Sequence, residues 1–243
     1  MQYLPLLLND PTVVDDLAFA AFHGYYAAQD TAQVIDYVRS RQPDLPVIVT
    51  EYTSFGFGDL DSGQEADDGV GFMLDVTNTL LSHSGRTPTR RSTGMRSTTC
   101  SPGTMRLPAG GILRGPQRDF ARRRRYYGFL QALPYLRPGT RVLDTQLHGD
   151  APDLGYLAVR TPSGAPAIFL VNQSVDEVDL TLGLTGAGVP TFPSLAVWRT
   201  DREHSAEPFG RVQLQGGSGS LALPPRSLTT LFPAGAEVDP VDN

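Results

Sequence analysis

Residues 17–26 read LAFAAFHGYY, and residues 45–52 read LPVIVTEY. Both runs are too continuously apolar for strands with one face in water, so we predict strands buried on both faces, as in parallel sheets. Between them, Val34, Ile35 and Val38 recur at helical spacing, which predicts an amphipathic helix. A strand, a helix and a strand in this order predict a parallel pair joined by a crossover helix.

A third amphipathic stretch follows a polar, Gly-rich loop. Residues 70–84 read VGFMLDVTNTLLSHS, and we predict a helix with Phe72, Val76, Thr79 and Leu80 facing the core. The alternation of strands and helices indicates an α/β architecture with a parallel sheet.

Beyond Arg137 the sequence changes to short apolar runs at a spacing of about ten residues, which is typical of an antiparallel β-sandwich. We therefore predict an α/β part over residues 1–136, an all-β part over residues 137–235, and a tail over residues 236–243. The predicted strands are RVLDTQL (141–147), LGYLAVRT (154–161), APAIFLVNQS (165–174), VDLTLGL (178–184), SLAVWRT (194–200), RVQLQG (211–216) and SLALPPRSLTTLF (220–232).

The composition excludes several classes of protein. The chain has 243 residues, 40% of them hydrophobic and 19% charged, with 25 Gly and 20 Pro. It is long enough to bury a substantial core and too rich in loop residues for a helical bundle. No apolar run approaches the ~20 residues that cross a bilayer, and the opening MQYLPLLLND has neither the basic leader nor the apolar length of a signal peptide. We therefore expect no membrane association, and the sequence names no compartment.

The residues that commonly bind metals are scarce. Cys100 is the single cysteine, and the four His are scattered. One thiol excludes an internal disulfide and a multi-thiolate zinc or iron–sulfur site. We therefore expect neither a metal nor another cofactor.

All 20 basic residues are Arg, and eleven of them fall between Arg86 and Arg125, where Asp119 is the only acid. Such a block in a chain of net charge −6 raises the question of nucleic-acid binding. Residues 86–119 hold no aromatic side chain that could stack on bases, so we expect no nucleic-acid partner. For Arg122 to Arg125 we expect the solvated face of a helix.

The candidate chemistry lies at the ends of the first two predicted strands. Glu51 closes an otherwise apolar strand, and parallel α/β sheets and barrels build their active sites at the carboxyl ends of the strands. The neighbouring strand ends in His23-Gly24-Tyr25, and a spacing of two residues projects the imidazole and the phenol to one side. We therefore predict a pocket bordered by Glu51, His23 and Tyr25.

In these segments the chain resembles the clan A retaining glycoside hydrolases, cellulase-like (β/α)8-barrel enzymes that include families 5, 30 and 39. FHGYY (22–26) and LPVIVTEYTSFG (45–56) resemble their sixth and seventh strands, and the later segments resemble the β-sandwich that packs on such barrels. The resemblance implies about the last three units of a TIM barrel followed by an antiparallel β-sandwich. It also implies that Glu51 is the nucleophile, that Tyr25 donates a hydrogen bond to it, and that His23 contacts the sugar. The implied substrate is a carbohydrate whose O-glycosidic bond is hydrolysed with retention.

A retaining mechanism needs a second carboxyl group, about 5–5.5 Å from the nucleophile, as acid and then base. In the family this group belongs to an Asn-Glu pair at the end of strand four, and the chain contains no Asn-Glu dipeptide. Glu65 and Asp59 lie in the loop after Glu51, but we do not expect either to replace it. We therefore expect an inactive fragment that lacks its acid/base, and the partner that would complete it is an N-terminal barrel fragment.

Residues 86–110 lack apolar periodicity where the eighth strand is expected. Disorder is one interpretation. A second comes from the codons: back-translated with free choice at degenerate positions and read two bases later, the segment permits DAYPSVYWDAVDYLQPGHDAVTRWG, which contains a strand-like aromatic run. We hypothesise that a shifted reading frame encodes residues 86–110. Sequencing the locus tests this, and the same Arg-rich peptide in an undisturbed frame of close relatives would contradict it.

A different class of function also fits the residues: a non-catalytic carbohydrate-binding or structural β-sandwich module, with the N-terminal part as packing. Asn172-Gln173-Ser174 matches an N-glycosylation triplet, but it lies at a predicted strand end where a turn needs such residues. Trp198 is expected in the sandwich core, and His204 in a polar surface loop.

Overall fold

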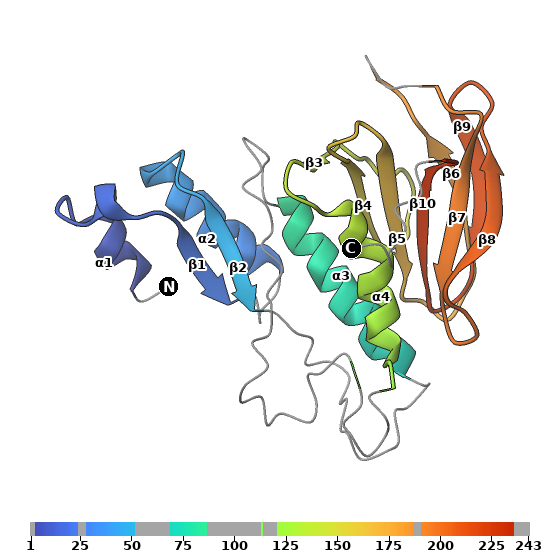
Figure 1. Cartoon of the computed structure of the whole chain (residues 1–243), viewed down its shortest axis with the longest axis horizontal. Coiled ribbons are helices and arrows are strands. Elements are labelled where there is room, and N and C mark those ends of the chain that lie inside the picture. Colours follow the sequence, from blue (N-terminus) through green and yellow to red (C-terminus); the bar gives the residue numbers. More distant parts are fainter. Residues whose placement is uncertain are drawn as a thin grey trace.

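The computed structural model describes residues 3–23, 28–51, 69–86, 113, 121–186 and 191–235 (Figure 1). The elements up to the sandwich are α1 (Leu4–Leu8), the 3-10 helix η1 (Val14–Asp16), β1 (Ala20–His23), α2 (Ala28–Arg41), β2 (Val47–Glu51), α3 (Val70–Arg86), α4 (Arg124–Ala132) and the 3-10 helix η4 (Leu133–Tyr135). The strands that follow are β3 (Arg141–Val142), β4 (Leu154–Arg160), β5 (Pro166–Asn172), β6 (Val178–Gly183), β7 (Ser194–Thr200), β8 (Ser205–Gln213), β9 (Ser218–Leu223) and β10 (Ser227–Pro233).

The N-terminal strands form a parallel pair, β1–β2, and α2 connects them as the apolar pattern predicts. The predicted burial on both faces was wrong, since Ala21 and His23 are exposed and Val47 to Thr50 are only half-buried. The reason is that two strands of this sheet are described and neither is flanked by a strand on both sides.

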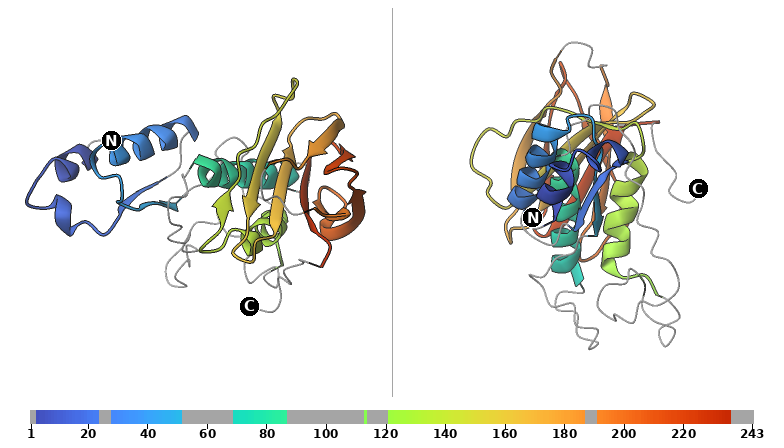
Figure 2. Two further views of the ribbon diagram at one scale, coloured as in Figure 1. Left: turned by 90° about the horizontal axis from the view of Figure 1, so that it is seen from above. Right: turned by 90° about the vertical axis from the view of Figure 1, so that its left-hand side faces the viewer.

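Ile35 and Val38 of α2 are buried and Val34 is half-buried, so the predicted inward face of this helix is confirmed. Val38 packs with Leu8 of α1 and Ala20 of β1 in a small apolar cluster. Figure 2 shows this unit and the C-terminal sheets at opposite ends of the molecule, with α3 between them.

The C-terminal strands form two antiparallel sheets, as predicted. Six strands pair in the order β3-β4-β5-β10-β7-β8, and β6 pairs with β9. Along β6, the half-buried Val178, Leu180 and Leu182 alternate with exposed residues, because only one face of the strand meets the core shared by the two sheets. The predicted run 220–232 is two strands, β9 and β10, separated by a turn in which Arg226 has φ +51°. Both β5 and β10 are buried along their whole length, so both faces of the larger sheet are covered.

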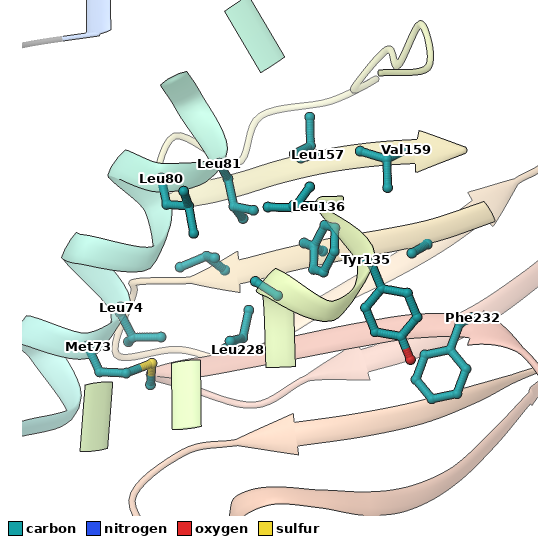
Figure 3. Close-up of a cluster of buried hydrophobic side chains, with 14 of the residues drawn as sticks. Met73, Leu74, Leu80, Leu81, Tyr135, Leu136, Leu157, Val159, Leu228 and Phe232 are labelled. Carbon is teal, nitrogen blue, oxygen red and sulfur yellow. The ribbon is translucent and has the colours of Figure 1, made fainter. Parts of the chain in front are cut away.

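The second face of the larger sheet is covered by α3 and α4 (Figure 3). Tyr135 stacks on Phe232 with ring centroids 5.3 Å apart. The Trp198 ring centroid lies 6.2 Å from that of Phe232, so Trp198 packs against the core as predicted, but it is half-buried. The boundary predicted between residues 136 and 137 stays a prediction. Both helices precede it and yet share the core of the sandwich. The buried members of this helix-covered core are Val70, Met73, Leu74, Leu80, Leu81, Ala132, Tyr135, Leu136, Leu157, Val159, Ala167, Phe169, Val171, Ala196, Leu228 and Phe232.

The inward face of α3 differs in part from the predicted one. Val76 and Leu80 are buried as predicted, whereas Phe72 and Thr79 are only half-buried. The prediction for these two was wrong because the apolar residues of this helix, seven of its 17 positions, form a wide stripe. Periodicity predicts the direction of such a wide stripe poorly. Contact with both α4 and the sheet selects a stripe through Val70, Met73, Leu74, Thr77, Leu80 and Leu81.

The arginine run at the start of α4 is solvated only in part. Arg123 and Arg125 are each 3% exposed. The expectation of a solvated helix face is right for Arg122, which is exposed, and wrong for Arg123 and Arg125. The Arg125 guanidinium stands 4.5 Å from the centre of the Phe72 ring of α3, so packing against that helix buries it.

The guanidinium group of Arg124 donates to the backbone carbonyl oxygens of Arg202 and His204, at 2.9 and 3.1 Å. The Arg124 guanidinium carries five donors and satisfies carbonyl oxygens of a packed loop. The run therefore ties α4 to the β7–β8 connection.

Gly128 of α4 lies directly against α3. A Cβ atom at this position would stand 2.6 Å from the Thr77 Oγ1 atom and 3.0 Å from the Met73 Cγ atom. We therefore expect Gly128→Ala to push the helices apart and to lower the free energy of unfolding by about 1–3 kcal/mol, the range for overpacking. Urea denaturation measures this loss. Gly183→Ala is the matched control, because a Cβ there meets nothing within 4 Å, and an equal loss in both variants would contradict the packing argument.

Candidate functional site

The β1–β2 pairing brings two of the three predicted site residues together. Its register pairs Phe22 with Val49 and then His23 with Glu51. Thr50 is therefore an additional residue of β2, and its hydroxyl donates to the Phe22 carbonyl oxygen at 3.2 Å. His23 and Glu51 thus lie opposite one another at the carboxyl ends of neighbouring parallel strands. No sequence pattern marks Thr50, because a bulge is defined by the pairing of two strands.

This position suits chemistry on a bound substrate. Active sites of parallel α/β folds lie beyond the carboxyl ends of the strands. A carboxylate there can act as a nucleophile or a base, and an imidazole can bond to a substrate hydroxyl. His23 is exposed. Tyr25, Asp59, Glu65 and residues 87–110 lie outside the described residues, and the roles predicted for Glu51, His23 and Tyr25 stay predictions.

The described part of the chain offers no competing metal site. Within it, no group of three or more His, Cys, Asp or Glu residues lies close enough to hold a metal ion. The helices described in the structure are also too short or too polar to cross a membrane. The expectation that the chain needs no metal or cofactor stays a prediction.

Comparison with known proteins identifies the fold. No known family model matches the chain, and no curated protein matches its sequence. Solved structures do match: a family 30 endoxylanase from Clostridium papyrosolvens aligns with a TM-score of 0.67 at 16% identity, over 93% of this chain and 51% of that one. A family 30 subfamily 8 xylanase from Clostridium acetobutylicum aligns with a TM-score of 0.64 at 14% identity, over 95% of this chain and 51% of that one.

The chain shares the fold of the aligned half of these glycoside hydrolases. A family 44 xyloglucanase from Paenibacillus polymyxa also aligns, with a TM-score of 0.53 at 16% identity, over 96% of this chain and 40% of that one. The resemblance to glycoside hydrolases seen in the sequence is therefore confirmed, whereas the partial (β/α)8 barrel that it implies stays a prediction. The chain spans about half the length of the two family 30 structures.

The residues of the glycosylation triplet are part of the packing of the sandwich. Asn172 is 1% exposed, and its Nδ2 atom donates to the carbonyl oxygens of Asp176, Leu223 and Pro224 at 2.9, 3.1 and 2.9 Å. Its Oδ1 atom accepts from the backbone N–H and the hydroxyl of Ser174. The side chain joins two turns, in agreement with the turn interpretation of the sequence.

A second group of polar and aromatic side chains lies around the β7–β8 connection. Asp201 accepts from the backbone N–H groups of Glu203 and His204, both at 2.8 Å, and lies 2.9 and 3.0 Å from the His204 Nδ1 atom. The His204 ring packs edge-on to Phe209, and the Arg199 guanidinium stands 3.6 Å from the centre of the same Phe209 ring. His204 lies in a loop as predicted, but it is half-buried and bonded rather than fully solvated.

The Asp201 contacts predict a change of stability with pH. Burial by itself would raise the pKa of Asp201, but hydrogen bonds from His204 and Glu203 outweigh it and hold the pKa below its ordinary value of 3.8. A lowered folded-state pKa adds stability that is present above the unfolded-state pKa and is lost as the pH falls through the folded-state pKa. We therefore expect Asp201→Asn to lower Tm near neutral pH and to flatten the acid side of the curve of Tm against pH.

Thermal unfolding followed by circular dichroism across the acid range measures this curve. Asp179→Asn is the control, because Asp179 is an exposed residue of β6. If the curve of Tm against pH keeps its acid-side slope in Asp201→Asn, other carboxylates control unfolding at low pH.

Proposed function

We propose that this chain is the C-terminal, nucleophile-bearing part of a retaining glycoside hydrolase whose barrel is completed by further strands. The pairing of His23 with Glu51 at the carboxyl ends of parallel strands carries this proposal. The fold shared with family 30 xylanases supports it. In the proposal, β1 and β2 correspond to the sixth and seventh strands of a (β/α)8 barrel.

The proposed reaction assigns one role to each site residue. Glu51 attacks the anomeric carbon, and a bond from its carboxylate oxygen forms as the bond to the leaving-group oxygen breaks. Tyr25 donates a hydrogen bond to Glu51, which favours the ionised carboxylate. His23 bonds to the sugar. A second carboxyl group, which this chain does not supply, protonates the leaving group and then deprotonates the water that releases the sugar.

The chain alone should not hydrolyse 4-nitrophenyl β-xyloside or β-glucoside above the rate in buffer. Loss of the general acid typically removes a factor of about 10²–10⁴ in rate, and the partial barrel lacks the other strands that enclose a sugar. Release of nitrophenol measures the rate, and Glu51→Gln should be equally inactive. Turnover that Glu51→Gln abolishes would show that the acid lies within this chain.

A separate experiment tests the nucleophile itself. In 2,4-dinitrophenyl 2-deoxy-2-fluoro-β-xyloside the leaving group departs without protonation, so that labelling does not need the acid. The chain is combined with a separately expressed N-terminal barrel fragment whose fourth β-strand ends in Asn-Glu. Mass spectrometry should find the sugar on the peptide that contains Glu51, and no label in Glu51→Gln. A label on another residue of this chain would contradict the assignment.

A non-catalytic carbohydrate-binding or structural module is the second candidate, and the two antiparallel sheets with their apolar core support it. Deleting residues 1–125 would remove α3 and uncover the larger sheet. The discriminating variant is therefore residues 69–235, which keeps both helices and removes Glu51. Electrophoresis in gels that contain xylan should leave its mobility unchanged if the chain is a hydrolase remnant, and should retard it if the sandwich is a binding module.

A further inference from the structure

The last step of the β1–β2 pairing is irregular. Between the pairs Phe22–Val49 and His23–Glu51, β2 contains one residue more than β1. This residue is Thr50, which is half-buried and donates its hydroxyl to the Phe22 carbonyl oxygen at 3.2 Å. Bulges are rare between parallel strands and are enriched next to active sites, where they redirect a side chain.

We propose that Thr50 is a positioning residue, whose hydroxyl holds the bulge that sets Glu51 opposite His23. The proposal rests on the proposed function of Glu51. In a regular register, His23 would pair with Thr50, and Glu51 would lie one residue further along, a displacement of about 3.3 Å. Catalytic groups need placement within about 0.5 Å, so such a displacement would separate the two groups functionally.

The bulge also changes the face of the sheet on which the residues at the end of β2 lie. Successive residues of a strand point to opposite faces, and a slip of one residue exchanges the faces of all residues beyond it. The bulge therefore decides two properties at once: the distance of Glu51 from His23 along the strands and the face that the end of β2 presents. The hydrogen bond from the Thr50 hydroxyl to the Phe22 carbonyl oxygen lies at the step between the two registers and stabilises the shifted one.

Two substitutions separate the hydroxyl from the shape of the side chain. Thr50→Val keeps the β-branched shape that suits a strand and removes the donor. Thr50→Ser keeps the donor and removes the methyl group. If the hydroxyl holds the bulge, Thr50→Ser retains the register and Thr50→Val loses it, whereas a packing role predicts the reverse order.

Interstrand nuclear Overhauser contacts between backbone protons of the isotope-labelled full chain report the register directly. In the unchanged chain and in Thr50→Ser we expect contacts of His23 with Glu51. In Thr50→Val we expect contacts of His23 with position 50 instead, while the amide signals of the sandwich stay in place. Retention of the His23–Glu51 contacts in Thr50→Val, or their absence from the unchanged chain, would overturn the proposal.

Thr50→Ala covers the case in which Thr50→Val disorders the strand pair. Loss of the His23–Glu51 contacts in both variants, together with their retention in Thr50→Ser, supports the role of the hydroxyl. Their loss in Thr50→Ser as well would overturn it. The register is measured without a substrate, so this result is independent of the labelling experiment that tests Glu51 as the nucleophile.

Discussion

Residues 137–235 expressed alone should fail to fold cooperatively, although they contain every strand of both antiparallel sheets. The reason is the helix-covered face of the larger sheet. Phe169 and Leu228 are 0% exposed and Phe232 is 1% exposed, and α3 and α4 pack over this face. Burying one large apolar side chain contributes about 1.5–3 kcal/mol. Uncovering several of them removes a large share of a total stability of about 5–15 kcal/mol.

Residues 69–235 are the matched control, because they keep both helices. We expect this longer fragment to show a cooperative thermal transition and a near-ultraviolet circular dichroism signal from packed aromatic rings. The shorter fragment should bind the dye ANS and aggregate, as expected of an exposed apolar sheet face. A cooperative transition in residues 137–235 would instead support a domain boundary after residue 136.

Gln131→Leu should be among the most destabilising single substitutions in the described part of the chain. Gln131 lies on α4, is 3% exposed, and forms polar contacts inside the helix–sheet interface. Its Nε2 atom donates to the Trp198 carbonyl oxygen and to the Thr230 Oγ1 atom, both at 2.9 Å, and its Oε1 atom accepts from the Thr200 hydroxyl at 2.6 Å. The same Thr200 oxygen accepts the backbone N–H of Ala206, so the network reaches the start of β8.

Leucine would fill the space and remove the hydrogen bonds of Gln131 to these three partners, although the Thr200 oxygen would keep the N–H of Ala206. Each buried polar group left unsatisfied costs about 1–3 kcal/mol, so we expect a loss on the order of 3–5 kcal/mol in the free energy of unfolding. Urea denaturation measures it, and Gln146→Leu at an exposed position is the control. In the double variant Gln131→Leu with Thr230→Val, part of the loss should be recovered, because both members of one pair are then apolar. Additive losses would argue against the network.

The local elements of this fold followed from sequence patterns. The crossover helix with Ile35 and Val38 inward is present, and so are the parallel pair and the antiparallel strands. These features depend on spacing within one segment, which the sequence displays. The direction of the α3 stripe and the burial of Arg123 and Arg125 were not predictable in this way, because they depend on which distant surface covers the helix.

The candidate site was likewise predictable from the sequence only in part. Glu51 and His23 were singled out by their place at the ends of apolar runs, and the structure brings their backbones opposite one another. Thr50 was missed, although it stands next to Glu51 in the chain. Its importance appears only when β2 is laid beside β1, because one strand has no register of its own.

The sequence alone determined the type and order of most strands and helices, because each depends on the periodicity of apolar and turn-forming residues along one segment. Their limits were less predictable, since the predicted strand 17–26 is β1 (Ala20–His23) and the run 220–232 is two strands. The tertiary structure decided which helix faces cover the larger sheet. It also decided that Gln131 of α4 forms a hydrogen bond to β10 of that sheet, and that Thr50 shifts the pairing at the end of β2 by one residue. These are properties of two segments in contact. The free energy of each depends on pairing, packing and desolvation between residues far apart in the chain. Sequence patterns within one segment do not show these contacts.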